Sequence, residues 1–236
     1  MLKVNDWIKR LKYLAFNRTT YYDNSFPANC GEINPDGSIS FDCIGMEKSV
    51  LNEPDIVYKT KPAGYHVKPG QVVPDWADGA GILGLCTDAK WWDFSTIVPG
   101  EHLYMRTDGH GGVYVGEFVH AGLTYNVIEC TAAWAGGVIP TYLDKKTGAR
   151  LQYKGGPQCY AWEAHGKLSK YIDYKTEEKS MFNDVPTTDK NYKYYKWAVK
   201  NGLLNIDKNG NFNPDKTMKK KHIAIILYRF YKLLKK

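Results

Sequence analysis

Residues 38–51 read SISFDCIGMEKSVL, a pattern that predicts the start of a helix with a cysteine in its first turn. Asp42 is a good N-cap residue, because its carboxylate accepts a hydrogen bond from a free backbone N–H two or three positions on. Met46 and Val50 follow at the spacing of one buried helix face. Cys43 would then be the first helical residue, where the positive end of the helix dipole stabilises a thiolate. The stretch offers either a nucleophile or a small buried side chain, the commoner role of a cysteine.

The chain around this stretch predicts an α+β domain. Residues 4–16 and 78–85 have the pattern of helices. After a Pro-Gly turn at 99–100, short β-rich runs separated by glycine turns follow at residues 102–106, 111–119, 123–129 and 142–153. Helices followed by consecutive antiparallel strands indicate helices packed on a small antiparallel sheet.

The C-terminal end differs from the rest in charge. The chain has a net charge of +7, and residues 179–236 carry +10 of it, from fourteen Lys and Arg against four Asp, whereas the remainder carries −3. A charged, featureless stretch precedes this basic end. We therefore expect one domain at residues 1–175, a linker at 176–180 and a second unit at 181–236.

Two helices are predicted in the second unit, at residues 192–201 and 219–234. The later one has an apolar stripe and a basic face, which suits either a membrane surface or the core of its own unit, and we expect the core. The basic charge favours an anionic partner such as a cell-wall polymer, nucleic acid or a lipid surface. The alternative is a solvated face that only keeps the protein soluble.

Several classes of protein are disfavoured. The five cysteines are an odd number without CxxC spacing, which argues against a disulfide scaffold and against a zinc site of paired cysteines. No HExxH motif or other metal-ligand pattern is present, so we expect neither metal nor cofactor. No apolar run reaches the roughly 20 residues that span a membrane. The N-terminus lacks the apolar block of a signal peptide, and synthesis in a cytoplasm is expected.

A cysteine nucleophile needs a base, and the base needs a group that orients it. His110 lies in the glycine-rich run Gly109-His110-Gly111-Gly112. Because glycine has no side chain, Gly109 and the two glycines after His110 would let a substrate chain approach the strand. Glu129 lies in an apolar strand, where an acidic residue is costly without a partner. If their strands are neighbours, Glu129 would accept a hydrogen bond from the His110 imidazole. The alternatives are that His110 lies in a turn and faces water, and that Glu129 forms a salt bridge with a lysine.

In order and spacing, these motifs resemble the NlpC-type papain-like cysteine peptidases of bacterial cell walls, closest to their phage endolysin branch. The motifs are Phe41-Asp42-Cys43, residues 99–104, Gly109-His110-Gly111-Gly112 and Val127-Ile128-Glu129. The resemblance covers roughly residues 17–174. It implies a papain-like fold in which Cys43 attacks an amide, His110 is the base and Glu129 orients it. Many members have histidine where this chain has Glu129.

Several aromatic side chains suggest substrate contacts. Tyr22 corresponds to a tyrosine that lies beside the oxyanion site in the family, and the Cys43 backbone N–H would be the main oxyanion donor. Trp92 and Trp134, with Trp91, would line a groove for glycan or stem peptide. The alternative is that these tryptophans fill cores, as aromatic residues usually do.

The second unit resembles a single S-layer homology module, in its residues 181–186, 196–203 and 209–215. Such modules bind anionic secondary polymers of Gram-positive walls, which implies roles for Asp184, Trp197, Lys219 and Lys220. Lys219-Lys220 replaces a Thr-Arg pair and keeps the charge without the bidentate geometry of arginine. These modules commonly come in threes, so a single one either binds weakly or acts through a homo-oligomer.

Together these features predict a peptidoglycan hydrolase of the endolysin type that cleaves a stem-peptide amide and reaches the wall after release from the host cell. An amidase of the CHAP type, which would use the same triad on the sugar–peptide amide, is one alternative. A wall-binding protein with an inert Cys43 is another. Nucleic acid is not the expected partner, although binding by the lysine-rich end is a third alternative.

Overall fold

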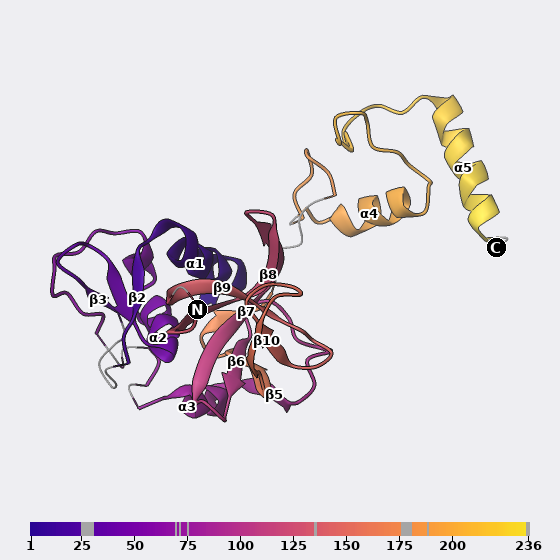
Figure 1. Ribbon diagram of the computed structural model, residues 1–236. Coiled ribbons are helices and arrows are strands. Elements are labelled where there is room, and N and C mark those ends of the chain that lie inside the picture. Colours follow the sequence, from indigo (N-terminus) through magenta and orange to yellow (C-terminus); the bar gives the residue numbers. More distant parts are fainter. Residues whose placement is uncertain are drawn as a thin grey trace. The chain divides into compact units, whose positions relative to one another are not determined.

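The computed structural model describes residues 1–24, 31–68, 70, 72–74, 76–134, 136–175, 181–187 and 189–234. The predicted linker at 176–180 and Cys30 lie outside the described residues. The chain divides into two compact units, Met1–Thr176 and Glu177–Lys236 (Figure 1).

The first unit mixes helices with a large antiparallel sheet. Its helices are α1 (Val4–Asn17), α2 (Cys43–Asn52), the 3₁₀ helix η1 (Pro54–Val57) and α3 (Gly79–Leu85). Its strands are β1 (Leu2–Lys3), β2 (Thr20–Tyr22), β3 (Glu32–Ile33), β4 (Ile39–Phe41), β5 (Thr87–Trp91), β6 (His102–Met105), β7 (His110–His120), β8 (Leu123–Thr131), β9 (Gly137–Leu143), β10 (Ala149–Leu151), β11 (Gln158–Ala161), β12 (Ala164–Lys167) and β13 (Ile172–Asp173).

Eight strands form the main sheet, in the order β11-β10-β9-β8-β7-β6-β12-β5. The predicted strands at 102–106, 111–119 and 123–129 are present as β6, β7 and β8, and the predicted hairpin at 142–153 contains the end of β9 and all of β10. Residues 137–141 of β9 were not predicted as a strand. Each strand from β6 to β10 is antiparallel to the next. The prediction of a small sheet was wrong, because β5, β11 and β12 extend it on both sides. These three strands are short and mostly polar in sequence, so no alternating apolar pattern indicated them.

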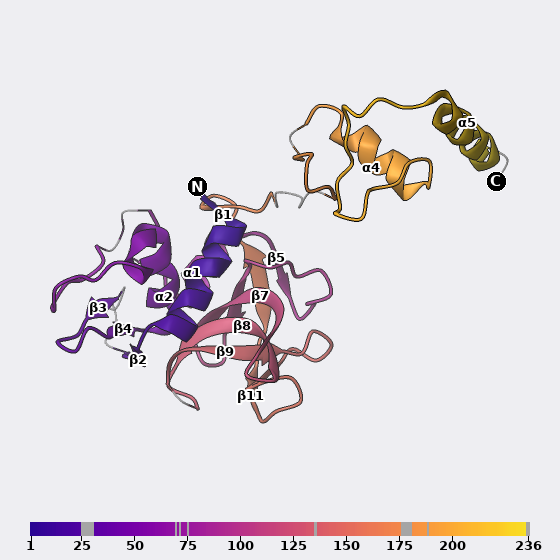
Figure 2. The same cartoon turned by 90° about the horizontal axis from the view of Figure 1, so that it is seen from above.

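Helices α1 and α2 cover one face of this sheet, along β7, β8 and β9 (Figure 2). Trp7, Leu11 and Leu14 of α1 are fully buried there, as its apolar stripe predicted. They share one core with Met46 and Val50 of α2. A second apolar cluster of the main sheet includes Phe94, Leu103, Met105, Tyr114, Val127 and Trp162.

The loop predicted before the cysteine helix contains strands. β2 pairs in parallel with β4, which leads directly into α2, and Tyr22 is the register partner of Phe41. Because the two pairing segments lie about twenty residues apart and each has three residues, periodicity within either one could not reveal them. The pairing places Tyr22 beside the start of the cysteine helix.

The second unit contains α4 (Tyr192–Lys200) and α5 (Lys220–Leu234), close to the predicted bounds. Phe182, Val185 and Tyr192 form its small core. The prediction that α5 packs on this core was wrong, since none of its described residues is buried. Arg229, on the basic side of α5, donates to the carbonyls of Gly202 and Leu203 at 3.3 Å each, and the apolar stripe is left exposed.

Gly137 is a position where the fold requires glycine. Its φ is +74°, and an ideal Cβ there would lie 2.9 Å from the Thr20 carbonyl carbon, while the Val138 N–H donates to Thr20 Oγ1. We expect Gly137→Ala to lower the free energy of unfolding by about 2–4 kcal/mol, from left-handed strain plus the clash with β2. Gly122→Ala is the control, because Gly122 has a φ of +79° but no atom lies within 4 Å of an ideal Cβ there. Only left-handed strain should lower its free energy of unfolding, by about 1–2 kcal/mol. Chemical denaturation measures both, and equal losses would contradict a close contact of β2 with β9.

Candidate active site

Cys43 is the first residue of α2, as the sequence predicted. The Asp42 carboxylate caps the helix by accepting a hydrogen bond from the Gly45 N–H. The Cys43 side chain is half-buried and has a free thiol. The thiol therefore lies where unpaired helix N–H groups point and where solvent has access, as a nucleophile requires.

His110 and Glu129 form a buried hydrogen bond between the adjacent strands β7 and β8. His110 Nε2 lies 2.5 Å from Glu129 Oε2, and the two side chains are 7% and 0% exposed. The alternatives, a water-facing His110 and a lysine-paired Glu129, are excluded by this geometry. The Trp162 ring stacks on the imidazole, with centroids 5.6 Å apart. The imidazole is thus held at one nitrogen and on one face.

Arg150 and Thr141 complete the surroundings of Glu129. Arg150 Nε lies 3.0 Å from each Glu129 oxygen, and Thr141 Oγ1 donates to Oε1 at 2.5 Å. Burial alone would raise the pKa of Glu129, but the hydrogen bonds and charges of His110 and Arg150 outweigh it and lower the pKa to about 2. The carboxylate is therefore ionised at neutral pH, although the Glu129 side chain has no solvent exposure.

The groups around His110 also favour the protonated form of its imidazole. Burial lowers the pKa of this imidazole, but hydrogen bonds to Cys43 and Glu129 outweigh it and raise the pKa to about 9. Since Nε2 faces Glu129, Nδ1 is the ring nitrogen left to interact with Cys43. An imidazole between a cysteine sulfur and a carboxylate is the arrangement of a cysteine nucleophile with a proton acceptor and an orienting group.

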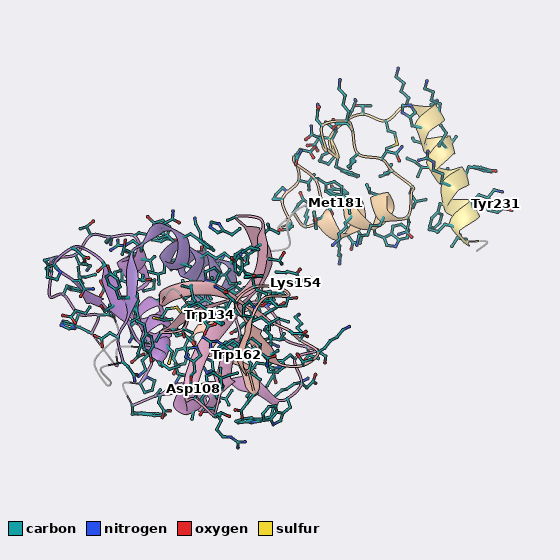
Figure 3. The ribbon with its side chains drawn as sticks, viewed as in Figure 1. Asp108, Trp134, Lys154, Trp162, Met181 and Tyr231 are labelled. Atoms are coloured by element: carbon teal, nitrogen blue, oxygen red, sulfur yellow. The ribbon has the colours of Figure 1, made fainter. Side chains whose placement is uncertain are left out.

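Tyr22 and Trp134 lie close to these residues. Partial burial and the nearby Cys43 and Asp42 raise the pKa of Tyr22 to about 12, so its hydroxyl stays a hydrogen-bond donor at neutral pH. Trp134 is half-buried, and the Arg150 guanidinium carbon lies 4.6 Å from the centre of its ring. Figure 3 labels Trp134 and Trp162 among the side chains of this unit.

The other two predicted substrate residues are Gly109, directly before His110, and Trp92, which lies farther away in the strand order. Gly109 has a φ of +60° in the turn that precedes His110. Trp92 follows the edge strand β5, three strands from β7, and is 63% exposed. Trp91 is 43% exposed, so neither of these adjacent tryptophans fills a core.

A second buried pair lies between α2 and the sheet, and the sequence analysis missed it. His102 Nδ1 lies 2.9 Å from Glu47 Oε1, and both side chains are fully buried. In the described structure His102 Nε2 has no hydrogen-bond partner. Gly111 makes room for this contact, because a Cβ there would collide with Ile44 of α2. Helix α2 is thereby fixed over β6 and β7, close to His110.

Arg150 was also missed. It follows the turn at residues 144–148, in a sequence context typical of a solvent-exposed hairpin end. The only available signal was the predicted Glu129 itself, because a buried carboxylate needs a cationic partner. Nothing in the local pattern distinguished Arg150 from the surrounding lysines.

The predicted polymer-binding residues all lie in the second unit. Trp197 is 48% exposed, and Lys219 and Lys220 are exposed at the start of α5. Asp184 accepts hydrogen bonds from the Phe212 and Asn213 N–H groups, both at 2.7 Å, so its carboxylate organises the loop between the helices.

The described residues contain no group of three or more His, Cys, Asp or Glu side chains able to hold a metal ion. Nor is any helix in the described ranges both long and apolar enough to cross a membrane.

Comparison with known proteins bears on the second unit. Residues 182–224 match the S-layer homology domain. Domains of this family bind secondary polymers of the cell envelope, which supports association of this chain with a cell wall. No curated protein and no solved structure matches the chain. The family match therefore describes the C-terminal unit and leaves the first unit to be interpreted from its geometry.

The first test concerns the charge on Glu129. We expect Glu129→Gln to lower the pKa of His110 from about 9, because burial, which lowers it, remains while the attraction of the carboxylate is lost. NMR titration of the imidazole measures the shift. In the wild type, His110 stabilises the fold fully below its ordinary pKa of 6.5, and this contribution is lost as the pH rises through about 9. The variant should lose less stability over that range.

Glu117→Gln is the matched control for this test. Glu117 is an exposed carboxylate that pairs with Lys154 at 2.9 Å, so its neutralisation should leave the His110 titration in place. An unchanged His110 midpoint in Glu129→Gln would contradict the coupling of the two groups.

Proposed function

We propose that the chain is a peptidoglycan hydrolase of the endolysin type, which cleaves a stem-peptide amide with Cys43, His110 and Glu129. The observation that supports this best is the buried His110–Glu129 hydrogen bond beside a cysteine at a helix N-terminus. The S-layer homology match supports the wall as the location of the substrate.

In the proposed reaction, the proton of Cys43 already lies on His110 Nδ1, so that a thiolate faces an imidazolium, and the thiolate attacks the carbonyl carbon of the amide. Backbone N–H groups at the start of α2 stabilise the oxyanion, with the Tyr22 hydroxyl as a neighbouring donor. The imidazolium then protonates the leaving amine, and water hydrolyses the thioester. Glu129 stays ionised throughout and holds the imidazole by Nε2, so its role is orientation and charge stabilisation.

The second unit would hold the enzyme at the wall. Its charge of +10 over residues 179–236 suits an anionic secondary polymer. The exposed apolar stripe of α5 supports self-association of this unit, through which several single modules would bind one polymer with avidity.

The catalytic proposal predicts that fragments are released from purified Gram-positive peptidoglycan by the wild type and not by Cys43→Ala. Removal of the nucleophile should lower the rate by at least about a thousandfold, since only binding and oxyanion stabilisation remain. Mass spectrometry of the fragments identifies the bond. Cys159→Ala is the control, because it removes another half-buried free thiol in the same unit.

Each alternative predicts a different result. Release of whole stem peptides, cut at the amide that joins peptide to sugar, would indicate an amidase of the CHAP type. Equal release by wild type and Cys43→Ala, or none on walls of several chemotypes, would favour a non-catalytic wall-binding protein.

The polymer-binding proposal predicts that a double variant, Lys219→Ala with Lys220→Ala, binds purified walls about tenfold less tightly and with a weaker salt dependence. Lys145→Ala with Lys146→Ala is the control, since it removes two exposed lysines of the first unit. Sedimentation with walls measures affinity, and light scattering of the same samples measures the oligomeric state. Equal losses for the two variants would mean that net charge alone attracts the protein.

A further inference from the structure

An exposed aromatic surface lies at the end of the sheet that carries β5. Between residues 76 and 92, the large apolar side chains that are exposed are all tryptophan: Trp76, Trp91 and Trp92. Trp76 and Trp91 are 68% and 43% exposed. Because exposed tryptophan has a large cost in water, a cluster of this kind marks a binding surface.

Strand pairing connects Trp91 to β7, the strand that carries His110. Trp91 pairs with Ala164, Ala164 with Tyr104, and Tyr104 with Gly111, which directly follows His110. Residues paired in this way project from the same face of a sheet. Trp91 therefore shares the face of Gly111, whereas His110, one residue earlier, projects from the other face of β7.

Two neighbours hold the Trp91 ring. The Tyr104 ring meets it edge to face, with centroids 6.2 Å apart. The Arg106 guanidinium carbon lies 5.4 Å from the ring centre, and Arg106 Nε lies 3.6 Å from a Glu163 oxygen. The Arg106 side chain is still 68% exposed, so its N–H groups can reach a ligand that contacts Trp91.

Trp76 flanks the same region through α3. A Cβ on Gly81 would lie 3.2 Å from the Trp76 ring. A Cβ on Gly79, in the first turn of α3, would lie 2.9 Å from the Tyr104 ring and 3.1 Å from the Gly109 carbonyl oxygen. The start of α3 thus packs against both the turn before His110 and the residue that supports Trp91.

We propose that Trp76, Trp91 and Arg106 form a subsite for the glycan strand of peptidoglycan. Aromatic faces stack on the C–H faces of pyranose rings, and a guanidinium donates to sugar hydroxyl and N-acetyl oxygens. A lipid or protein partner would instead favour a continuous apolar patch, whereas here the rings are interspersed with charged groups. This inference rests on the proposed hydrolase function and names a second part of its substrate.

The test compares two substrates, glycan-linked stem peptides and the same peptides freed from the glycan. The quantity compared is the ratio of kcat/KM on glycan-linked peptides to kcat/KM on free peptides. We expect this ratio to be about tenfold lower for Trp91→Ala than for the wild type, mainly because KM for the glycan-linked peptides rises. Trp91→Phe should restore most of the ratio, because it keeps an aromatic face. Tyr160→Ala is the control, since Tyr160 is 56% exposed on β11, at the opposite end of the strand order.

A separate binding measurement does not depend on activity. Titration of the Cys43→Ala protein with soluble, peptide-free glycan strands should quench tryptophan fluorescence, and the double variant Cys43→Ala with Trp91→Ala should bind about tenfold less tightly. The subsite would be overturned if Trp91→Ala lowered kcat/KM equally on both peptide substrates. It would also be overturned if the double variant bound glycan as tightly as Cys43→Ala does. Glycan binding through Trp91 without any hydrolysis by the wild type would instead overturn the proposed function and leave the subsite standing.

Discussion

The charge of Glu129 is the constraint on which the site depends. A carboxylate without solvent exposure is stable only when its partners replace water, and here they come from three other strands: His110 on β7, Thr141 on β9 and Arg150 on β10. In the sheet order β7 and β9 flank β8, and β10 lies on the far side of β9. The same contacts that ionise Glu129 therefore fix the register of β7 to β10, and they hold the imidazole by Nε2. Stability of the sheet and orientation of His110 have one common cause.

The cysteine is positioned by a different set of contacts. Asp42 caps α2, and the buried pair of Glu47 with His102 joins this helix to β6 one turn after Cys43. Glycine at position 111 allows the helix to approach the sheet at that point. The proposed nucleophile, Cys43, and the proposed base, His110, thus lie on two separately fixed elements, a capped helix and a strand of the sheet. If the proposed function holds, this fixation of both groups supplies the preorganisation that nucleophilic catalysis requires.

Local pattern predicted the parts of this site whose signal lies within one element. The helix at Cys43 has its cap and its apolar spacing within ten residues, and the strands of His110 and Glu129 have glycine turns between them. The missed residues depend on contacts between distant segments. Glu47 and His102 are 55 positions apart, and Arg150 is 21 positions from Glu129. In sequence each of them resembles a surface charge, and only the tertiary fold makes it a buried partner.

The division of charge between the two units has a physical consequence for the proposed function. Residues 179–236 carry a charge of +10, which attracts an anionic polymer, whereas the remaining residues carry a net charge of −3, which does not. A catalytic unit that is not itself attracted to the polymer can release one stem peptide and meet the next while the chain stays on the wall. Tethering then raises the local substrate concentration, and the pocket needs only modest affinity for each peptide.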